Sequence, residues 1–179
     1  RAAGSTLRFA GFLALYEADV VPALEGLRRA VIHGDANDHN AVAGDPKSWP
    51  REIVSVVDFG DMHHGLVVAE PAVAAAYAIM DTADPLEAAA RVVAGYHDAF
   101  PLEEAEIACL YGLVGARLAV SVVNSAHVKK LKPDDPYVTI SEAPAWAALE
   151  RLDSVHPRLA HYTFRSVCGL PPVPQAPAV

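Results

Sequence analysis

Residues 33–40 read HGDANDHN, and residues 53–61 read IVSVVDFGD. In both places a short run of β-branched residues, typical of a strand, leads into a polar loop. Loops at the ends of strands are where side chains commonly converge on a ligand. We therefore expect Asp35, Asn40 and Asp58 to face one cleft.

These residue types suit a particular chemistry. Carboxylate and amide oxygens, as on Asn40 and Asp58, are ligands for a hard cation such as Mg²⁺. A further carboxylate, Asp35, can take a proton from a hydroxyl, and phosphoryl transfer needs both functions. The simpler interpretation is that Asp35 and Asp38 are turn residues that satisfy nearby backbone N–H groups.

The rest of the chain predicts a mainly α fold with a small β element, of the α+β class. Apolar residues recur at helical spacing in most segments, and Pro22 is expected near the start of a second helix that covers 19–29. Strands are expected only at 31–32, 41–43 and 53–57. The expected helices are 5–18, 19–29, 69–81, 85–98, 103–130, 142–152 and 156–168.

Composition excludes several classes of function. The 179 residues carry a net charge of -8, and only four are lysines, all after position 46, so no basic stripe for nucleic acid is present. Cys109 and Cys168 lie in apolar helical surroundings and are predicted to be buried thiols in a reducing compartment. Arg117 separates the apolar runs 107–116 and 118–128, which leaves no uncharged run of the ~18 residues that a membrane helix needs. The prediction is a cytoplasmic protein that binds neither nucleic acid nor membrane.

The pattern HGD-x-x-x-x-N followed by VVDFGD resembles the C-terminal lobe of the aminoglycoside phosphotransferase and choline kinase family, relatives of protein kinases. The segments HGDANDHN, VVDFGDMHHG and AEPAVAAAYAIM are most similar to the hydroxylysine kinase branch, which in bacteria is often fused to a class III aminotransferase. The resemblance covers about residues 5–170. It implies a domain at 1–170, and a mobile Pro-rich tail is expected at 171–179.

The resemblance assigns roles to single residues. Asp35 matches the catalytic base, and His33 matches the residue that braces the catalytic loop. Asn40 and Asp58 match the ligands of Mg²⁺, bound together with ATP or GTP. Glu70 matches the acidic residue that opens the next helix, with a structural role.

Substrate-binding candidates are Asp38, His39 and Asp61, the last at a position where the family often has a further acidic residue. The resemblance implies transfer of the γ-phosphoryl group to a hydroxyl of an amino alcohol or a hydroxy-amino acid. The acidic surface would tolerate such an amino-bearing substrate.

A kinase of this type also needs a nucleotide-binding lobe with a phosphate-covering loop and a strand lysine. Before His33 the sequence has no lysine and only scattered glycines, in 32 largely helical residues. We therefore expect the helical C-terminal lobe of a protein-kinase-like fold without its N-terminal lobe, inactive by itself. The missing lobe is an implied partner, and a homo-oligomer is possible because the lobe's contact surface would be exposed.

Two other functions remain open at this point. The chain could be a non-catalytic kinase-like module that binds a ligand or partner. It could also be a metal-dependent phosphohydrolase that uses Asp35, His39, Asp58, Asp61 and His63. Against the latter, adjacent histidines such as His63 and His64 point different ways and are more typical of a surface. Tyr77, Tyr96 and Tyr111 are predicted core residues, of which one could face a cationic substrate.

Overall fold

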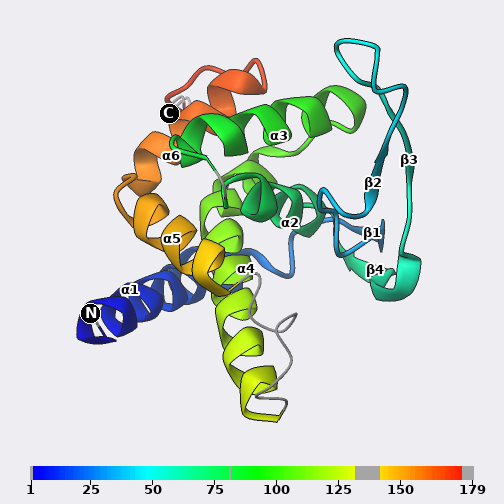
Figure 1. Cartoon of the computed structure of the whole chain (residues 1–179). Coiled ribbons are helices and arrows are strands. Elements are labelled where there is room, and N and C mark those ends of the chain that lie inside the picture. Colours follow the sequence, from blue (N-terminus) through cyan, green and yellow to red (C-terminus); the bar gives the residue numbers. More distant parts are fainter. Residues whose placement is uncertain (1, 81, 132–141, 175–179) are drawn as a thin grey trace, which may run out of the picture.

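The computed structural model describes residues 2–80, 82–131 and 142–174, and in this part of the chain helices form most of the molecule (Figure 1). The helices are α1 (Ala2–Leu15), a π-helical turn η1 (Tyr16–Val20), the 3-10 turns η2 (Val21–Ala23) and η3 (Phe59–Asp61), α2 (Ala69–Ala78), α3 (Pro85–Ala99), α4 (Glu104–Leu131), α5 (Glu142–Asp153) and α6 (Pro157–Val167). The strands are β1 (Arg29–Ile32), β2 (Ala41–Ala43), β3 (Ile53–Val56) and β4 (His63–Leu66).

The long helix α4 forms the centre of the core. It packs against α1, α2, α5 and α6. Its buried apolar residues recur at helical spacing, among them Ile107, Leu110, Val114 and Leu118, all at most 1% exposed. By length and composition α4 could cross a membrane, but 56% of its most apolar 18-residue window is buried inside the molecule. It is therefore the core helix of this fold.

A glycine allows α1 and α4 to approach closely. A Cβ added to Gly115 of α4 would lie 2.2 Å from Cδ1 of Phe12 on α1. Phe12 is 2% exposed and stacks at a tilt on Tyr111, with ring centroids 5.8 Å apart. The missing side chain at Gly115 thus leaves the space that the Phe12 ring fills.

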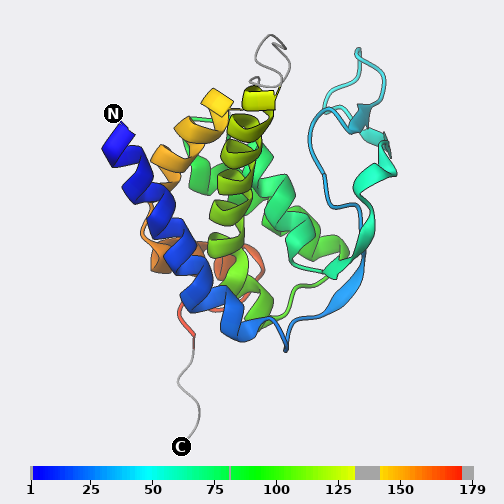
Figure 2. The ribbon, with the colours of Figure 1, turned by 90° about the horizontal axis from the view of Figure 1, so that it is seen from below.

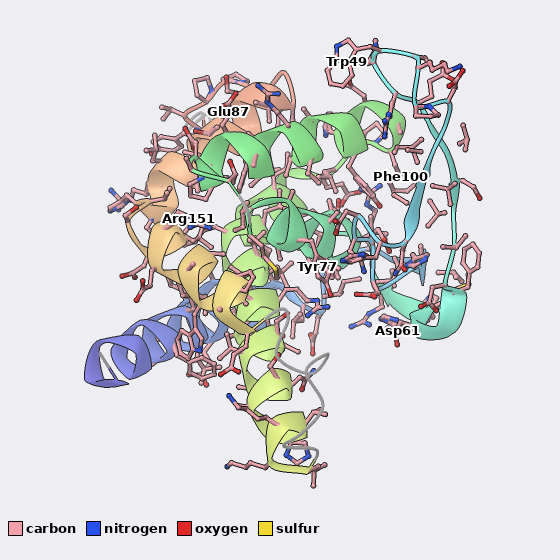
Figure 3. The ribbon with its side chains drawn as sticks, viewed as in Figure 1. Trp49, Asp61, Tyr77, Glu87, Phe100 and Arg151 are labelled. Carbon is pink, nitrogen blue, oxygen red and sulfur yellow. The ribbon has the colours of Figure 1, made fainter. Side chains whose placement is uncertain are left out.

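The strands form two separate antiparallel pairs at one side of the helices (Figure 2). Strand β1 pairs with β4, with Ile32 opposite His63. Strand β2 pairs with β3, with Ala41 opposite Val56. The β2–β3 hairpin extends away from the helices, and its tip carries Trp49, which is 91% exposed and far from Tyr77 (Figure 3). The first strand pair therefore anchors the loops to the helices, while the second projects outward.

The mainly α architecture with a small β element is confirmed, as are the long helices α2 to α6. The predicted helix 19–29 is wrong, because α1 runs on through η1 into η2 and the chain then turns into β1. Pro22 lies in the first turn of η2, the helix-start position expected for a proline, but η2 ends at Ala23. Strand β4 was not predicted.

Two smaller expectations concern the cysteines and the tail. Cys109 and Cys168 are free and buried, as predicted. Burial raises the pKa of both thiols, which disfavours the reactive thiolate. Of the predicted tail 171–179, residues 175–179 lie outside the described part of the chain.

Candidate active site

Strand β1 leads directly into the loop 33–40, and Gly34 sets the conformation of this loop. Its φ is +80°, and an added Cβ would lie 2.7 Å from the carbonyl oxygen of Asp61. Only glycine fits a position with both features. The Gly34 N–H donates to Oε2 of Glu70 at 3.1 Å. Glu70, in the first turn of α2, thus fixes the start of the loop, consistent with the structural role expected for it.

The carboxylate of Asp35 lies at the centre of a hydrogen-bond network. Its Oδ2 accepts from Nδ2 of Asn37 at 3.0 Å and from Nδ2 of Asn40 at 3.2 Å. Its Oδ1 accepts from the Tyr77 hydroxyl at 3.1 Å and from Nη2 of Arg117 at 3.3 Å. The Asp35 side chain is nevertheless 23% exposed. It is held in one orientation and can still meet a ligand.

Asn40 is nearly buried, at 8% exposure. Its Nδ2 also donates to the Asp35 carbonyl at 3.0 Å, which turns the amide nitrogen toward Asp35. In the described part of the chain its Oδ1 has no hydrogen-bond donor. This oxygen is therefore available to a cation.

Val57 connects the loop to Asp58. Its N–H donates to the Asn40 carbonyl at 2.9 Å, which extends the β2–β3 pairing by one residue. Its carbonyl lies 2.9 Å from Nε2 of His33. Asp58 follows immediately, in the left-handed region with φ 63°, which Asp tolerates better than most residues. The backbone thus brings Asp58 next to Asn40, and the contact of His33 fits a bracing role.

The exposed carboxylate of Asp58 has one backbone partner, the Gly60 N–H at 3.4 Å from its Oδ1. The exposed carboxylate of Asp58 and the amide oxygen of Asn40 are oxygen donors of the type that Mg²⁺ prefers. Neither Asp35 nor Asp58 is among the residues that line the cavity beside Asn40, so the common cleft expected for the three residues stays a prediction, as do their roles.

The substrate-binding candidates are less tightly organised. Asp38 and His39 are exposed, and the His39 backbone N–H donates to Oδ1 of Asn37 at 2.9 Å. Asp61 is exposed at the end of η3, where its carbonyl lies 2.8 Å from Nδ1 of His63. Asp38 lines a cavity of about 650 Å³ together with Asn37, Asn40 and Tyr77.

His63 and His64 are exposed in β4, as expected of surface residues. Among the residues that the structure describes, no three His, Cys, Asp or Glu side chains are grouped so that they could hold a metal ion. The phosphohydrolase interpretation therefore gains no support.

Sequence reasoning missed Arg117 as a site residue and named Tyr77 only as a core residue, but both side chains reach Asp35. Nη2 of Arg117 donates to the Tyr77 hydroxyl at 2.8 Å, and its guanidinium lies 5.0 Å from the centre of the Tyr77 ring. Burial is the main cause of a raised pKa of Tyr77, which keeps the hydroxyl protonated as a donor to Asp35. One signal was present in the sequence: Arg117 is the single Asp, Glu, Lys or Arg between positions 107 and 128, and such a charge needs a partner.

Comparison with known proteins gives a consistent result. Residues 5–107 match the model of the phosphotransferase enzyme family. Over 143 residues the chain is 30% identical to the hydroxylysine kinase of Mus musculus (77% of this chain, 38% of the relative) and 33% identical to that of Danio rerio (79% and 40%). The hydroxylysine kinase of Xenopus laevis is 32% identical (76% and 38%). The chain thus spans about two fifths of the length of these curated relatives. No solved structure matches it significantly.

Proposed function

The chain belongs to the phosphotransferase enzyme family, and we propose that it is the catalytic lobe of a small-molecule kinase. The observation that carries the proposal is a pair of hydrogen bonds made by Asn40. Its Nδ2 donates to the Asp35 carboxylate, and its carbonyl accepts from the N–H of Val57, the residue before Asp58. In this proposal a base and two oxygen ligands serve one site. The donor is ATP or GTP, and the acceptor is a hydroxyl of a hydroxy-amino acid or an amino alcohol.

Asp35 acts as the base in this proposal. The acceptor hydroxyl donates to the accessible carboxylate of Asp35, which takes its proton as the oxygen attacks the γ-phosphorus. The new O–P bond forms while the bond from the γ-phosphorus to the bridging oxygen breaks, and the nucleoside diphosphate leaves. Because Tyr77 and Arg117 fix the Asp35 carboxylate, no reorientation is needed during the reaction.

Asn40 and Asp58 fit Mg²⁺, since both can offer oxygen atoms and neither oxygen is consumed by a charged partner in the described part of the chain. When bound with the nucleotide, Mg²⁺ would neutralise phosphate charge. His33 would keep the two loops together through Val57. The proposed contacts of the amino-bearing substrate are Asp38, His39 and Asp61.

The relatives named hydroxylysine kinase support hydroxylysine as the first acceptor to try. A nucleotide-gripping loop and a strand lysine are not found among these 179 residues, since no lysine precedes Lys47 and helical turns precede β1. The 179 residues by themselves are therefore proposed to be inactive.

The test is Asp35→Asn in the natural protein that carries these residues. The kcat for hydroxylysine phosphorylation should fall about 100- to 10,000-fold, as expected for loss of a general base, with KM little changed. Asp45→Asn is the matched control, because Asp45 makes only local turn contacts on the β2–β3 hairpin. Turnover of Asp35→Asn close to that of Asp45→Asn would remove Asp35 from the mechanism.

A further inference from the structure

Asn37 uses every hydrogen-bonding position of its side-chain amide inside the loop 33–40. Its Nδ2 donates to the Asp35 carbonyl at 3.1 Å and to Oδ2 of the Asp35 carboxylate at 3.0 Å. Its Oδ1 accepts from the backbone N–H of His39 at 2.9 Å and from that of Asn40 at 3.1 Å. An amide has two N–H donors and two acceptor positions, so all four are occupied.

The oxygen half of this amide makes an ordinary turn. A side-chain oxygen that accepts from the N–H two residues further on forms an Asx turn, and Asp forms it as well as Asn does. The same kind of turn occurs on the β2–β3 hairpin, where Oδ1 of Asp45 accepts from the Lys47 N–H at 2.9 Å. The turn by itself therefore does not require an amide at position 37.

The nitrogen half of the amide is the part that requires asparagine. A carboxylate at position 37 has no N–H to donate, and it would place a charged oxygen where Nδ2 now lies 3.0 Å from Oδ2 of Asp35. A reversed amide would have the same fault and would also turn its N–H groups toward two backbone N–H groups. The other three donors to the Asp35 carboxylate lie at 3.1 to 3.3 Å, so Asn37 makes its shortest hydrogen bond in the described part of the chain.

Asn37 also holds the carboxylate oxygen that the helices do not reach. Oδ1 of Asp35 accepts from Tyr77 of α2 and Arg117 of α4. Among the residues that the structure describes, Oδ2 accepts from the two loop amides alone, those of Asn37 and Asn40. Because Asn37 accepts from the Asn40 N–H as well, one side chain connects the proposed base to a proposed ligand of Mg²⁺.

We propose that Asn37 is a positioning residue of the loop 33–40, which fixes the Asp35 carboxylate through Nδ2 and the Asn40 backbone through Oδ1. The inference rests on the proposed kinase function. Asn37 touches no reacting atom in this scheme and acts through Asp35. A displacement of about 1 Å can cost a catalytic group about 100-fold in rate, so the loss of this hydrogen bond has a measurable effect.

The test compares Asn37→Asp and Asn37→Ala in the natural protein that carries these residues. Asp keeps the acceptor of the turn and loses the donor to Asp35, whereas Ala loses both and adds no charge. Both variants should lower kcat for hydroxylysine phosphorylation about 10- to 100-fold, and Asn37→Asp should change KM for the nucleotide by less than about threefold. Asp45→Asn is the matched control, because it makes the reverse exchange in an Asx turn of the hairpin, and it should keep the wild-type kcat.

Three results would overturn the inference. Wild-type turnover of Asn37→Asp would show that residue 37 serves the turn alone. Wild-type turnover of Asn37→Ala would show that the added charge explains the loss in Asn37→Asp. A raised KM for the nucleotide with an unchanged kcat would place Asn37 on the phosphate groups.

The double variant Asp35→Asn with Asn37→Asp tests whether Asn37 acts through Asp35. The residual kcat of Asp35→Asn should change by less than about threefold when Asn37→Asp is added, because the group to be positioned is already lost. A further 10- to 100-fold loss would mean that Asn37 acts on a different group, and it would contradict the positioning role.

Failure of the kinase function is recognised separately, because the wild type then phosphorylates no acceptor. In that case NMR of the natural protein still tests the hydrogen bond between Asn37 and Asp35. The side-chain amide signals of Asn37, identified by their loss in Asn37→Asp, should shift more in Asp35→Asn than those of Asn124, which is exposed on α4. Unchanged Asn37 signals would overturn the inference.

Discussion

At the scale of single residues, Glu106 and Asp35 differ in how far their carboxylates are exposed to solvent, and this difference decides which of them can meet a ligand. Glu106 is 0% exposed and accepts from Nε of Arg28 at 3.0 Å, from Nη2 at 2.5 Å and from the Glu103 N–H at 2.8 Å. The Asp35 carboxylate accepts four hydrogen bonds but remains 23% exposed. The fully buried carboxylate of Glu106 can only stabilise the fold, while the partly exposed carboxylate of Asp35 can also meet a substrate.

We predict that Glu106→Ala lowers the free energy of unfolding by about 2–3 kcal/mol. The change removes charged hydrogen bonds and the acceptor of the Glu103 N–H, although Arg28 can partly turn to water. Arg91→Ala is the control, because it breaks an exposed i,i+4 pair with Glu87 and should cost about 0.5 kcal/mol. Urea unfolding measures both, and equal losses in the two variants would show that the Arg28–Glu106 pair contributes little.

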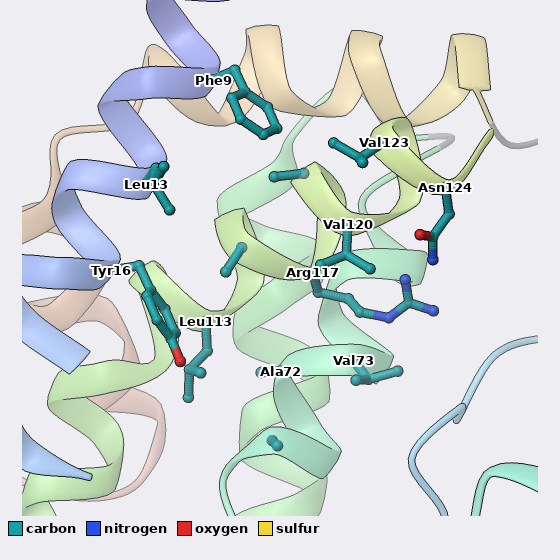
Figure 4. Close-up of a pocket in the computed structure, with 13 residues that line it drawn as sticks. Phe9, Leu13, Tyr16, Ala72, Val73, Leu113, Arg117, Val120, Val123 and Asn124 are labelled. Carbon is teal, nitrogen blue, oxygen red and sulfur yellow. The ribbon is translucent and has the colours of Figure 1, made fainter. Parts of the chain in front are cut away.

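At the scale of elements, the close packing of α1 on α4 forms one wall of the apolar pocket of about 460 Å³ that lies between α1, α2 and α4 (Figure 4). Phe12 fills the space at Gly115, while Phe9 and Leu13 on α1 face the pocket from the same side as Tyr16. The distance between the two helices therefore sets the width of the pocket that contains Arg117.

We predict that Gly115→Ala and Gly95→Ala shift stability in opposite directions. At Gly115 the new Cβ would overlap the Phe12 ring, and such overpacking typically costs about 1–3 kcal/mol. At Gly95, exposed on α3, no atom lies within 4 Å of the added Cβ, so the lower chain entropy of alanine should stabilise the helix by about 0.5–1 kcal/mol. Thermal unfolding compares the two variants, and a stabilised Gly115→Ala would contradict the packing.

At the scale of the whole molecule, the helices form one body and the strands project from it (Figures 1 and 2). Strand β3 and the turn after it expose Ile53, Val54 and Phe59, each more than half accessible. The base and the proposed Mg²⁺ ligands lie where this β region meets α2 and α4.

We predict that the 179 residues, produced alone, bind Mg²⁺–ATP and Mg²⁺–GTP weakly and give no turnover with hydroxylysine, choline, ethanolamine or homoserine. Phosphoryl transfer depends on positioning, and a metal held by two oxygen ligands competes poorly with water. Calorimetry and a nucleotide-turnover assay measure this. Micromolar nucleotide affinity or acceptor-dependent turnover would show that these residues suffice.

Local sequence determined much of this protein. Hydrophobic periodicity predicted the helices from α2 to α6, because each buries one face at regular spacing. The spacing of HGDANDHN also predicted a loop that turns Asp35 and Asn40 together, since these contacts span only five residues. At Pro22 the sequence predicted the start of a helix that runs to residue 29, whereas the structure has only the 3-10 turn Val21–Ala23 there.

Only the tertiary structure decided what surrounds Asp35. Tyr77 and Arg117 are 42 and 82 residues away along the chain, and they reach Asp35 because α2 and α4 pack side by side. Strand β4 likewise exists because β1 is beside it. Periodicity and turn residues act over a few positions, whereas these contacts depend on how buried faces fit one another. The sequence therefore predicted the loop 33–40, and the packing of the helices placed the Arg117 guanidinium beside Asp35.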